Sequence, residues 1–283
     1  MKRLIVTADD FGMSLEVNEA VEEAHRNGIL TCASLVVAGD AAEDAVARAK
    51  RLPGLGVGLH LAIFGARASA SEPSVLAADG ANLDERPVRT GSAIMLLPSG
   101  RKAARREIAA QFEAYRKTGL ELGHLDGHWH CHQHPIVLAQ ALEIGVPLGL
   151  RALRIPYEPL RFSRSVAGKA KTGARLGHAI MGLPLMLTMR LAAKAAGVVA
   201  NDRFFGKTDD GFISEDLLVS LLDNLPGGVT ELGLHPATAT WRGAHSPPPH
   251  WRQADELAAL TSPRVRAAVE RRGIMLQRWA DLA

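Results

Sequence analysis

A chain of 283 residues with 47% apolar and 22% charged residues has the balance of a globular protein with a full core, which excludes extensive disorder. The formal net charge of +3 is small for this length and gives no reason to expect a nucleic-acid partner. Two cysteines, Cys32 and Cys131, are too few for a disulfide framework, so a reducing compartment is expected.

The N-terminus and the apolar runs predict a cytoplasmic protein. The short apolar run at residues 4–6 ends just before the first aspartates, which leaves too little length for a signal peptide. Nowhere does the sequence reach the roughly 18–20 consecutive apolar residues that span a bilayer.

The first sixty residues are predicted to alternate between strand and helix. The expected strands are residues 3–8, 32–37 and 56–61, and the expected helices are residues 14–27 and 40–50. Ser14 is placed to cap the first helix and Gly28 to end it. Asp40, followed three residues later by Glu43, resembles a capping box for the second helix.

Residues 64–100 are rich in Ala, Ser, Gly and Pro without a clear period, so we expect a long functional or mobile loop there. Further on, the expected strands are residues 122–128, 153–156 and 229–235. The expected helices are residues 101–117, one that begins at Ser214, and one that begins at Ser262 and Pro263 and ends at Gly273. This alternation predicts an α/β fold with a mostly parallel sheet, open or closed into a barrel, and a single domain over residues 1–283.

Ionisable residues stand at the ends of three predicted strands. The first ends in Asp9 and Asp10, the third in His60, and the fourth in a segment that includes Asp126 and His128. Because ligands gather at the carboxyl ends of parallel strands, we expect these side chains to share one site. Adjacent residues of a strand point to opposite faces, so both aspartates can serve the site only where the strand bends. The alternative is that one of them caps the following helix.

A cluster of histidines strengthens this prediction. His60 alone would more often be a core histidine, but five of the eleven histidines, at positions 124, 128, 130, 132 and 134, fall within eleven residues. An extended segment would point all five to one side, whereas a helix would align positions 124, 128 and 132. Neither arrangement lets all five bind one ion, so most must support the ligands or face a substrate. Cys131 is a weaker candidate ligand.

His235 ends the last predicted strand and is followed by a proline. It could be a ligand, a proton donor or a buried structural residue. We favour the donor, because three protein ligands and a water already make an open catalytic metal site. The remaining histidines, His25, His178, His245 and His250, are predicted to be incidental.

Four segments occur in the order found in the YdjC-like carbohydrate deacetylases, which include chitooligosaccharide deacetylases. They are residues 7–12 (TADDFG), 58–60 (GLH), 124–132 (HLDGHWHCH) and 235–237 (HPA). The chain resembles this family from residue 1 to about residue 240, and within it the branch associated with hopanoid biosynthesis. The resemblance implies a distorted TIM-like (β/α) barrel that removes acetyl from an N-acetylated amino sugar, including a glycolipid such as an N-acetylglucosaminyl hopanoid.

The same resemblance implies roles for individual residues. Asp10, His60 and His128 correspond to the ligands of one divalent ion, which is Mg²⁺ by resemblance, although two imidazoles and a carboxylate would equally suit Zn²⁺. Asp9 corresponds to the catalytic base and His235 to the general acid. The chain departs from the usual pattern at Gly127, Trp129 and Cys131, where serine, histidine and valine are common. Candidates for supporting the ligands or touching the sugar are Asp126, Trp129, His130 and His132, and Trp129 could be a stacking platform.

Two rival functions stay open, a metal-dependent phosphoesterase and a non-catalytic metal-binding or lipid-binding protein. A separate prediction concerns a basic, apolar insertion at about residues 159–201, which has seven basic residues and no acidic one, while residues 176–189 have no formal charge. Such a segment could lie on an anionic membrane as a lid, which would place the protein peripherally on the inner membrane face. A buried helical hairpin with a basic edge would explain the pattern equally well.

Overall fold

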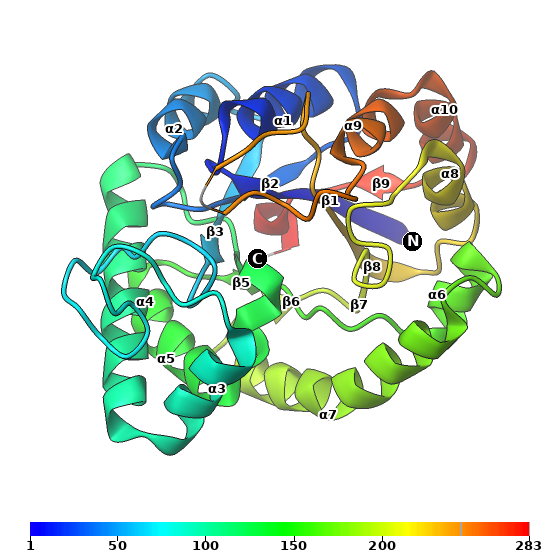
Figure 1. Ribbon diagram of the computed structural model, residues 1–283. Coiled ribbons are helices and arrows are strands. Elements are labelled where there is room, and N and C mark those ends of the chain that lie inside the picture. The colour runs from blue at the N-terminus through cyan, green and yellow to red at the C-terminus, as the bar shows by residue number, and fades with distance from the viewer. Residues whose placement is uncertain (244, 283) are drawn as a thin grey trace.

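The computed structural model describes residues 1–243 and 245–282, which are built around one curled parallel sheet (Figure 1). The strands are β1 (Lys2–Phe11), β2 (Cys32–Leu35), β3 (Gly56–Leu61), β4 (Leu125–Gly127), β5 (Ala152–Leu153), β6 (Val199–Ala200), β7 (Arg203–Phe205), β8 (Gly228–Leu234) and β9 (Met275–Leu276). Their order is β6-β5-β4-β3-β2-β1-β8-β7, with β9 added beside β1, and all these pairs are parallel. The predicted parallel (β/α) barrel is confirmed.

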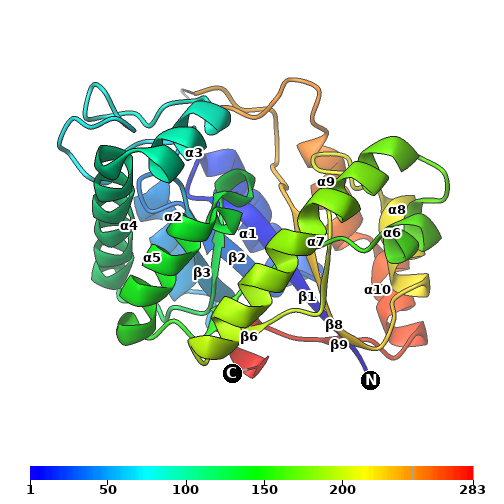
Figure 2. The ribbon, with the colours of Figure 1, turned by 90° about the horizontal axis from the view of Figure 1, so that it is seen from below.

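Helices surround this sheet on the outside (Figures 1 and 2). They are α1 (Leu15–Asn27), α2 (Ala42–Lys50), α3 (Pro87–Leu96), α4 (Pro98–Thr118), α5 (Pro135–Gly145), α6 (Leu160–Ala167), α7 (Thr172–Ala195), α8 (Glu215–Asp223), α9 (Gln253–Thr261) and α10 (Pro263–Arg271), with short 3₁₀ turns at His128–Gln133, Val146–Leu148 and Trp279–Leu282. The barrel is distorted where β6 meets β7, because no strand pairing joins them. Between these two strands, the side-chain amide of Asn201 bonds both backbone groups of Ile155, at 2.7 and 3.1 Å, and donates to the carbonyl of Arg203 at 3.0 Å.

The central strands are buried on both faces. In β1 every residue from Leu4 to Phe11 is buried, and in β8 so is every residue from Val229 to Leu234. Near-continuous apolar runs are typical of such strands, which is why the sequence predicted them well. The exceptions within these runs are buried polar residues, among them Asp9, Asp10 and Glu231. Because buried charges need partners, they indicate a functional site inside the barrel.

Three of the predicted helix caps are present, and one is wrong. The hydroxyls of Ser14, Ser214 and Ser262 each accept hydrogen bonds from backbone N–H groups of the first helical turn. Asp40 does not cap α2, whose N-terminal residue makes no side-chain cap. Its carboxylate instead pairs with Arg67 at 2.8 Å, and Ala41 occupies the N-cap position of α2.

The predicted long loop over residues 64–100 is partly wrong. Residues 62–86 lie outside the helices and strands, but α3 begins at Pro87 and α4 begins at Pro98, three residues earlier than expected. Both prolines occupy the first turn, where the missing N–H costs nothing. The sequence hid α3 because the helix buries few residues, among them Thr90 and Ile94, and therefore lacks a clear apolar stripe.

The basic, apolar segment forms α6 and α7. Pro184 lies inside α7 without ending it, so the helix is longer than the apolar run of the sequence suggested. An 18-residue stretch of α7 has a mean hydropathy of 1.3, which by length and composition alone would suffice to cross a membrane. Core helices of globular proteins can pass the same test, but just 22% of this stretch is buried.

Candidate active site

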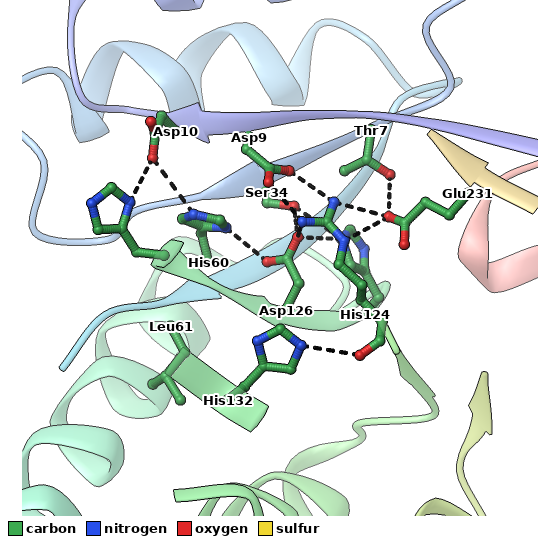
Figure 3. Close-up of polar contacts among 12 residues, drawn as sticks. Thr7, Asp9, Asp10, Ser34, His60, Leu61, His124, Asp126, His132 and Glu231 are labelled. Carbon is green, nitrogen blue, oxygen red and sulfur yellow. Dashed lines mark hydrogen bonds and ion pairs between the residues drawn. The ribbon is translucent and has the colours of Figure 1, made fainter. Parts of the chain in front are cut away.

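The structure brings together the three residues expected to bind a metal, Asp10, His60 and His128. Figure 3 shows Asp10 and His60 with the polar side chains around them. Asp10 lies near the end of β1, His60 in β3, and His128 directly after β4, so the parallel order of the strands collects them at one end of the barrel. The Asp10 carboxylate is 3.0 Å from His128 Nδ1 and 3.5 Å from His60 Nε2. All three can offer a ligand atom to one position.

A bend in β1 lets both aspartates face this end of the barrel. Asp10 has a φ of 64°, a left-handed conformation that aspartate adopts more readily than most residues, and the pairing of β1 with β2 shifts register between Ala8 and Phe11. The strand therefore bends at the two aspartates, as it must if both are to face the site. As a result Asp9 and Asp10 have different partners, and neither caps α1, whose cap is Ser14.

Asp9 is held by Arg154, a residue that the sequence reasoning did not single out. The guanidinium, directly after β5, bonds both carboxylate oxygens of Asp9, at 2.6 and 2.8 Å. It also lies 2.8 Å from Asp126 and 2.9 Å from Glu231, and all four side chains are buried. Burial alone would raise the pKa of Asp126, but Arg154 and His60 hold it well below its usual range. Arg154 is the second residue of the strand predicted at 153–156, but β5 ends at Leu153, so Arg154 directly follows its strand as His128 follows β4. An earlier end for the predicted strand would have placed it with the other site residues.

The orientation of His60 fits a metal ligand. Its Nδ1 is 2.8 Å from Asp126, and since that carboxylate is ionised, Nδ1 carries the proton and donates it. Its Nε2 faces an Asp10 oxygen at 3.5 Å, and this buried atom has no hydrogen-bond partner among the described residues. A carboxylate behind an imidazole in this way is the usual support of a histidine that binds a metal.

A second group of potential ligands fits a cation less well. Asp9, His60 and Asp126 also lie close enough together to hold an ion. However, Asp9 and Asp126 already share the positive charge of Arg154, which would repel a second cation at that position. Asp10 does not contact Arg154. Burial would raise the pKa of Asp10, but His128, His235 and His60 lower it below its usual range, so Asp10 is a carboxylate ready to bind a cation.

His235 lies across from Asp9, with its Nε2 3.9 Å from an Asp9 oxygen and its Nδ1 2.8 Å from Asp210. Its backbone N–H donates to Glu256 at 2.6 Å, which fixes the end of β8. Burial would lower the pKa of His235, but the carboxylates of Asp210, Asp10 and Asp9 raise it well above its ordinary value. The imidazole therefore holds a proton at neutral pH beside the site.

The histidine-rich segment is neither one extended strand nor one regular helix, because it runs from β4 into the irregular 3₁₀ turn at His128–Gln133. Trp129 and His130 have φ values of 47° and 56°, and two consecutive left-handed residues turn each side chain in a different direction. His130 packs edge-on against Phe204, whereas His132 is buried with its Nε2 3.0 Å from the Arg154 carbonyl. Asp126 and His132 thus support the site. Cys131 is buried, and burial raises the pKa of its thiol, so it stays neutral and is a poor metal ligand.

Two cavities of about 220 and 400 Å³ open on this site, and Trp129 and Trp251 line both. Asp10, His128 and His245 line the smaller cavity. The larger is lined by Asp9, His130, His178, Lys207, Asp210 and His235, among others. His178 and His245, which the sequence analysis set aside as incidental, therefore lie beside the site. His178 belongs to α7 and His245 to the segment after β8. No local sequence pattern revealed that these two segments lie over the site.

The fold and the site together define the class of protein. It is an α/β barrel with a buried group of carboxylates and imidazoles at one end that could hold a metal ion. More particularly, the chain belongs to the YdjC-like family, whose family model matches residues 3–271. The family prediction is confirmed, while the hopanoid-associated branch stays a prediction.

Relatives match over nearly the whole chain. A carbohydrate deacetylase from Geobacillus stearothermophilus is 32% identical over 273 residues, which cover 96% of this chain and 94% of that protein. A chitooligosaccharide deacetylase from Enterobacter sp. (strain 638) is 28% identical, with 99% of each chain covered. A solved structure from Enterococcus faecalis V583, described provisionally as a cellobiose-phosphate cleavage protein, has a TM-score of 0.71 at 24% identity, covers 100% of this chain and 99% of its own, and shows the fold alone.

Proposed function

We propose that this chain is a metal-dependent carbohydrate deacetylase that hydrolyses the N-acetyl group of an amino sugar. The observation that carries the proposal is the pairing of two units at one end of the barrel. One is the metal-type group of Asp10, His60 and His128, and the other is Asp9, held by Arg154 across from His235. The relatives named as carbohydrate deacetylases support the substrate class.

The residues divide the reaction between them. Asp10, His60 and His128 would hold a divalent ion, Mg²⁺ by family resemblance or Zn²⁺ by ligand type, which supplies polarisation of the acetyl carbonyl and a lower pKa for water. Asp9 takes a proton from the attacking water, and Arg154 fixes the carboxylate in place for that transfer. The water oxygen bonds to the acetyl carbon and the C–N bond breaks. His235 gives its proton to the departing nitrogen, so acetate and a free amine leave.

The larger cavity suits a sugar. Trp129, which is 60% exposed, and Trp251, which packs against His235, both line it, so indole rings are available to pack on a pyranose ring. His130, His178 and Lys207 offer polar groups to its hydroxyls. We extend the proposal to a lipid-borne amino sugar, such as an N-acetylglucosaminyl hopanoid, on the strength of the sequence resemblance. Deacetylation of such a conjugate in preference to free chitooligosaccharide tests this extension.

The proposal is tested by measuring acetate release from N-acetylchitooligosaccharides. Protein stripped of metal should be inactive, and Mg²⁺ or Zn²⁺ added back should restore turnover. A phosphoesterase would instead hydrolyse p-nitrophenyl phosphate under the same conditions, and a non-catalytic binding protein would bind metal without either activity. Restored phosphatase activity without acetate release would overturn the proposal.

The charge of Asp210 should control the alkaline limit of activity. Because Asp210 raises the pKa of His235 more than any other neighbour does, replacing Asp210 by asparagine lowers that pKa. His235 acts as an acid in its protonated form, so activity is lost as pH rises through its pKa. We expect the alkaline limb of the kcat/KM profile to move to lower pH in Asp210→Asn. Asp216→Asn, at an exposed carboxylate paired with Arg264, is the control and should leave the limb in place.

A further inference from the structure

We propose that the outer face of α7, with the cations of α6 and α7, docks this protein on an anionic phospholipid surface. The proposal rests on the exposed side chains and charges of this segment and does not depend on the proposed deacetylase activity. Both ribbon views place α7 at the outside of the barrel, and Figure 2, seen from below, shows it in front of the sheet.

Helix α7 has its large apolar residues on the wrong side for a core helix. The residues that it buries are mostly small, Ala179, Gly182 and Ala193 among them. The exposed residues include Leu176, Ile180, Leu183, Leu187 and Leu191, which recur every three or four positions and so form one continuous stripe, with Met181 beside it. A stripe of this length on the surface is typical of an interaction site, because isolated exposed apolar residues are common but contiguous ones are not.

The positive charges around the stripe indicate that its partner is anionic. Arg161, Arg164, Lys169 and Lys194 are exposed, and none of them has an ion pair within residues 1–243 and 245–282. No acidic residue occurs from residue 159 to residue 201. A second copy of the chain packed on the same face would set these cations against each other. An anionic lipid surface instead complements them while it covers the apolar stripe.

Contacts on the inner side of α7 favour a helix that lies on the membrane over one that crosses it. Arg175 is buried and binds Glu158 at 2.8 Å and Asp209 at 2.5 Å, which ties the start of α7 to the barrel. Inserting α7 across a bilayer would break these ion pairs and move Arg175 into hydrocarbon. His178, three residues later, lines the larger cavity with Asp9 and His235, so a docked helix also brings that cavity to the lipid surface.

Co-sedimentation of the full chain with vesicles tests the proposal. We expect binding to phosphatidylcholine vesicles that contain phosphatidylglycerol, little binding to pure phosphatidylcholine, and weaker binding at higher salt. The double variant Leu187→Ser/Leu191→Ser removes apolar contact, and Lys169→Glu/Lys194→Glu reverses two cations. Each should lower the partition coefficient by about tenfold or more.

The matched control is Leu96→Ser in α3, because Leu96 is 73% exposed and Leu191 is 71% exposed. It should bind vesicles as the unmodified protein does, and thermal unfolding should show that all variants fold. Intact protein that ignores phosphatidylglycerol vesicles at low salt would overturn the proposal, as would equal binding by all variants. A dimer in sedimentation velocity that Leu187→Ser/Leu191→Ser dissociates, without vesicle binding, would assign the stripe to self-association instead. Acetate release from a soluble substrate is a separate readout, so failure of docking leaves the deacetylase proposal standing.

Discussion

Replacing His60 with alanine is expected to remove bound metal and turnover together. His60 offers a buried Nε2 toward Asp10 while Asp126 holds its Nδ1, so alanine deletes a ligand and leaves Asp126 without that partner. One electrostatic stabiliser is worth about 10²–10³-fold in kcat, and the loss of the ion should exceed this. Asp10→Ala and His128→Ala should behave in the same way. Metal analysis of the purified variants and acetate release, measured on the same preparations, check the result.

His134→Ala is the matched control for these variants. His134 belongs to the same cluster in the sequence, but it lies near Gly91 of α3 and is not among the residues that can share an ion. It should keep its metal and its activity. Full metal content together with full turnover in His60→Ala would show that the proposed metal site is wrong.

Replacing Asp9 with asparagine should have the second largest effect, and of a different kind. The ion stays, because Asp9 is not one of its proposed ligands, but an amide cannot take a proton from water. We expect kcat to fall by about 10²–10⁴-fold, the usual contribution of a general base. Asparagine also keeps just one acceptor oxygen, and its NH₂ group faces the Arg154 guanidinium, so a lower Tm should accompany the loss of turnover.

Three measurements separate this role from its alternatives: metal content, kcat and thermal unfolding of Asp9→Asn. Asp40→Asn is the control, since that carboxylate makes an exposed ion pair with Arg67 and should change none of the three. Loss of the metal in Asp9→Asn, with the metal retained in Asp10→Asn, would mean that the two aspartates have exchanged roles.

The partners of the carboxylates also bear on the phosphoesterase alternative. A site for two metals needs several free carboxylates. Asp210, at the larger cavity, pairs with His235 at 2.8 Å, and the buried carboxylates around His60 and Arg154 are Asp9, Asp10, Asp126 and Glu231. Three of them contact Arg154, and Asp10 is the exception. The guanidinium therefore leaves one carboxylate for an ion, which favours a single metal.

The sequence predicted those parts of the fold whose signal is local. Strands such as β1 and β8 are recognisable from the apolar residues in each run despite the polar residues among them, and the serine caps act within one turn. By contrast β5, β6 and β9 have two residues each, too few for any period, and their positions depend on neighbouring strands. The same division holds for the site, because Asp10, His60 and His128 end recognisable strands, whereas His178 reaches the cavity through the tertiary placement of α7.

The conformation of the histidine-rich segment was also beyond local reasoning. Either a strand or a helix would have given its side chains a regular direction. Trp129 and His130 instead adopt left-handed conformations, which cost free energy that the packing around them must offset. No residue type in that segment signals such a turn, since neither residue is a glycine.

Arg154 links the catalytic groups to the strands of the barrel wall, two parts of a protein that can usually mutate independently. From the end of β5 it bonds Asp9 of β1, Asp126 of β4 and Glu231 of β8, and Asp126 in turn orients His60. One side chain thus fixes the proposed base and a proposed metal ligand, and it also ties opposite walls of the barrel. A substitution at this position would damage chemistry and folding at once, whereas residues 62–86, 236–243 and 245–252 include no residue that has both roles. We therefore expect homologues that acquire new sugar preferences to diverge in those loops and to inherit the arginine unchanged.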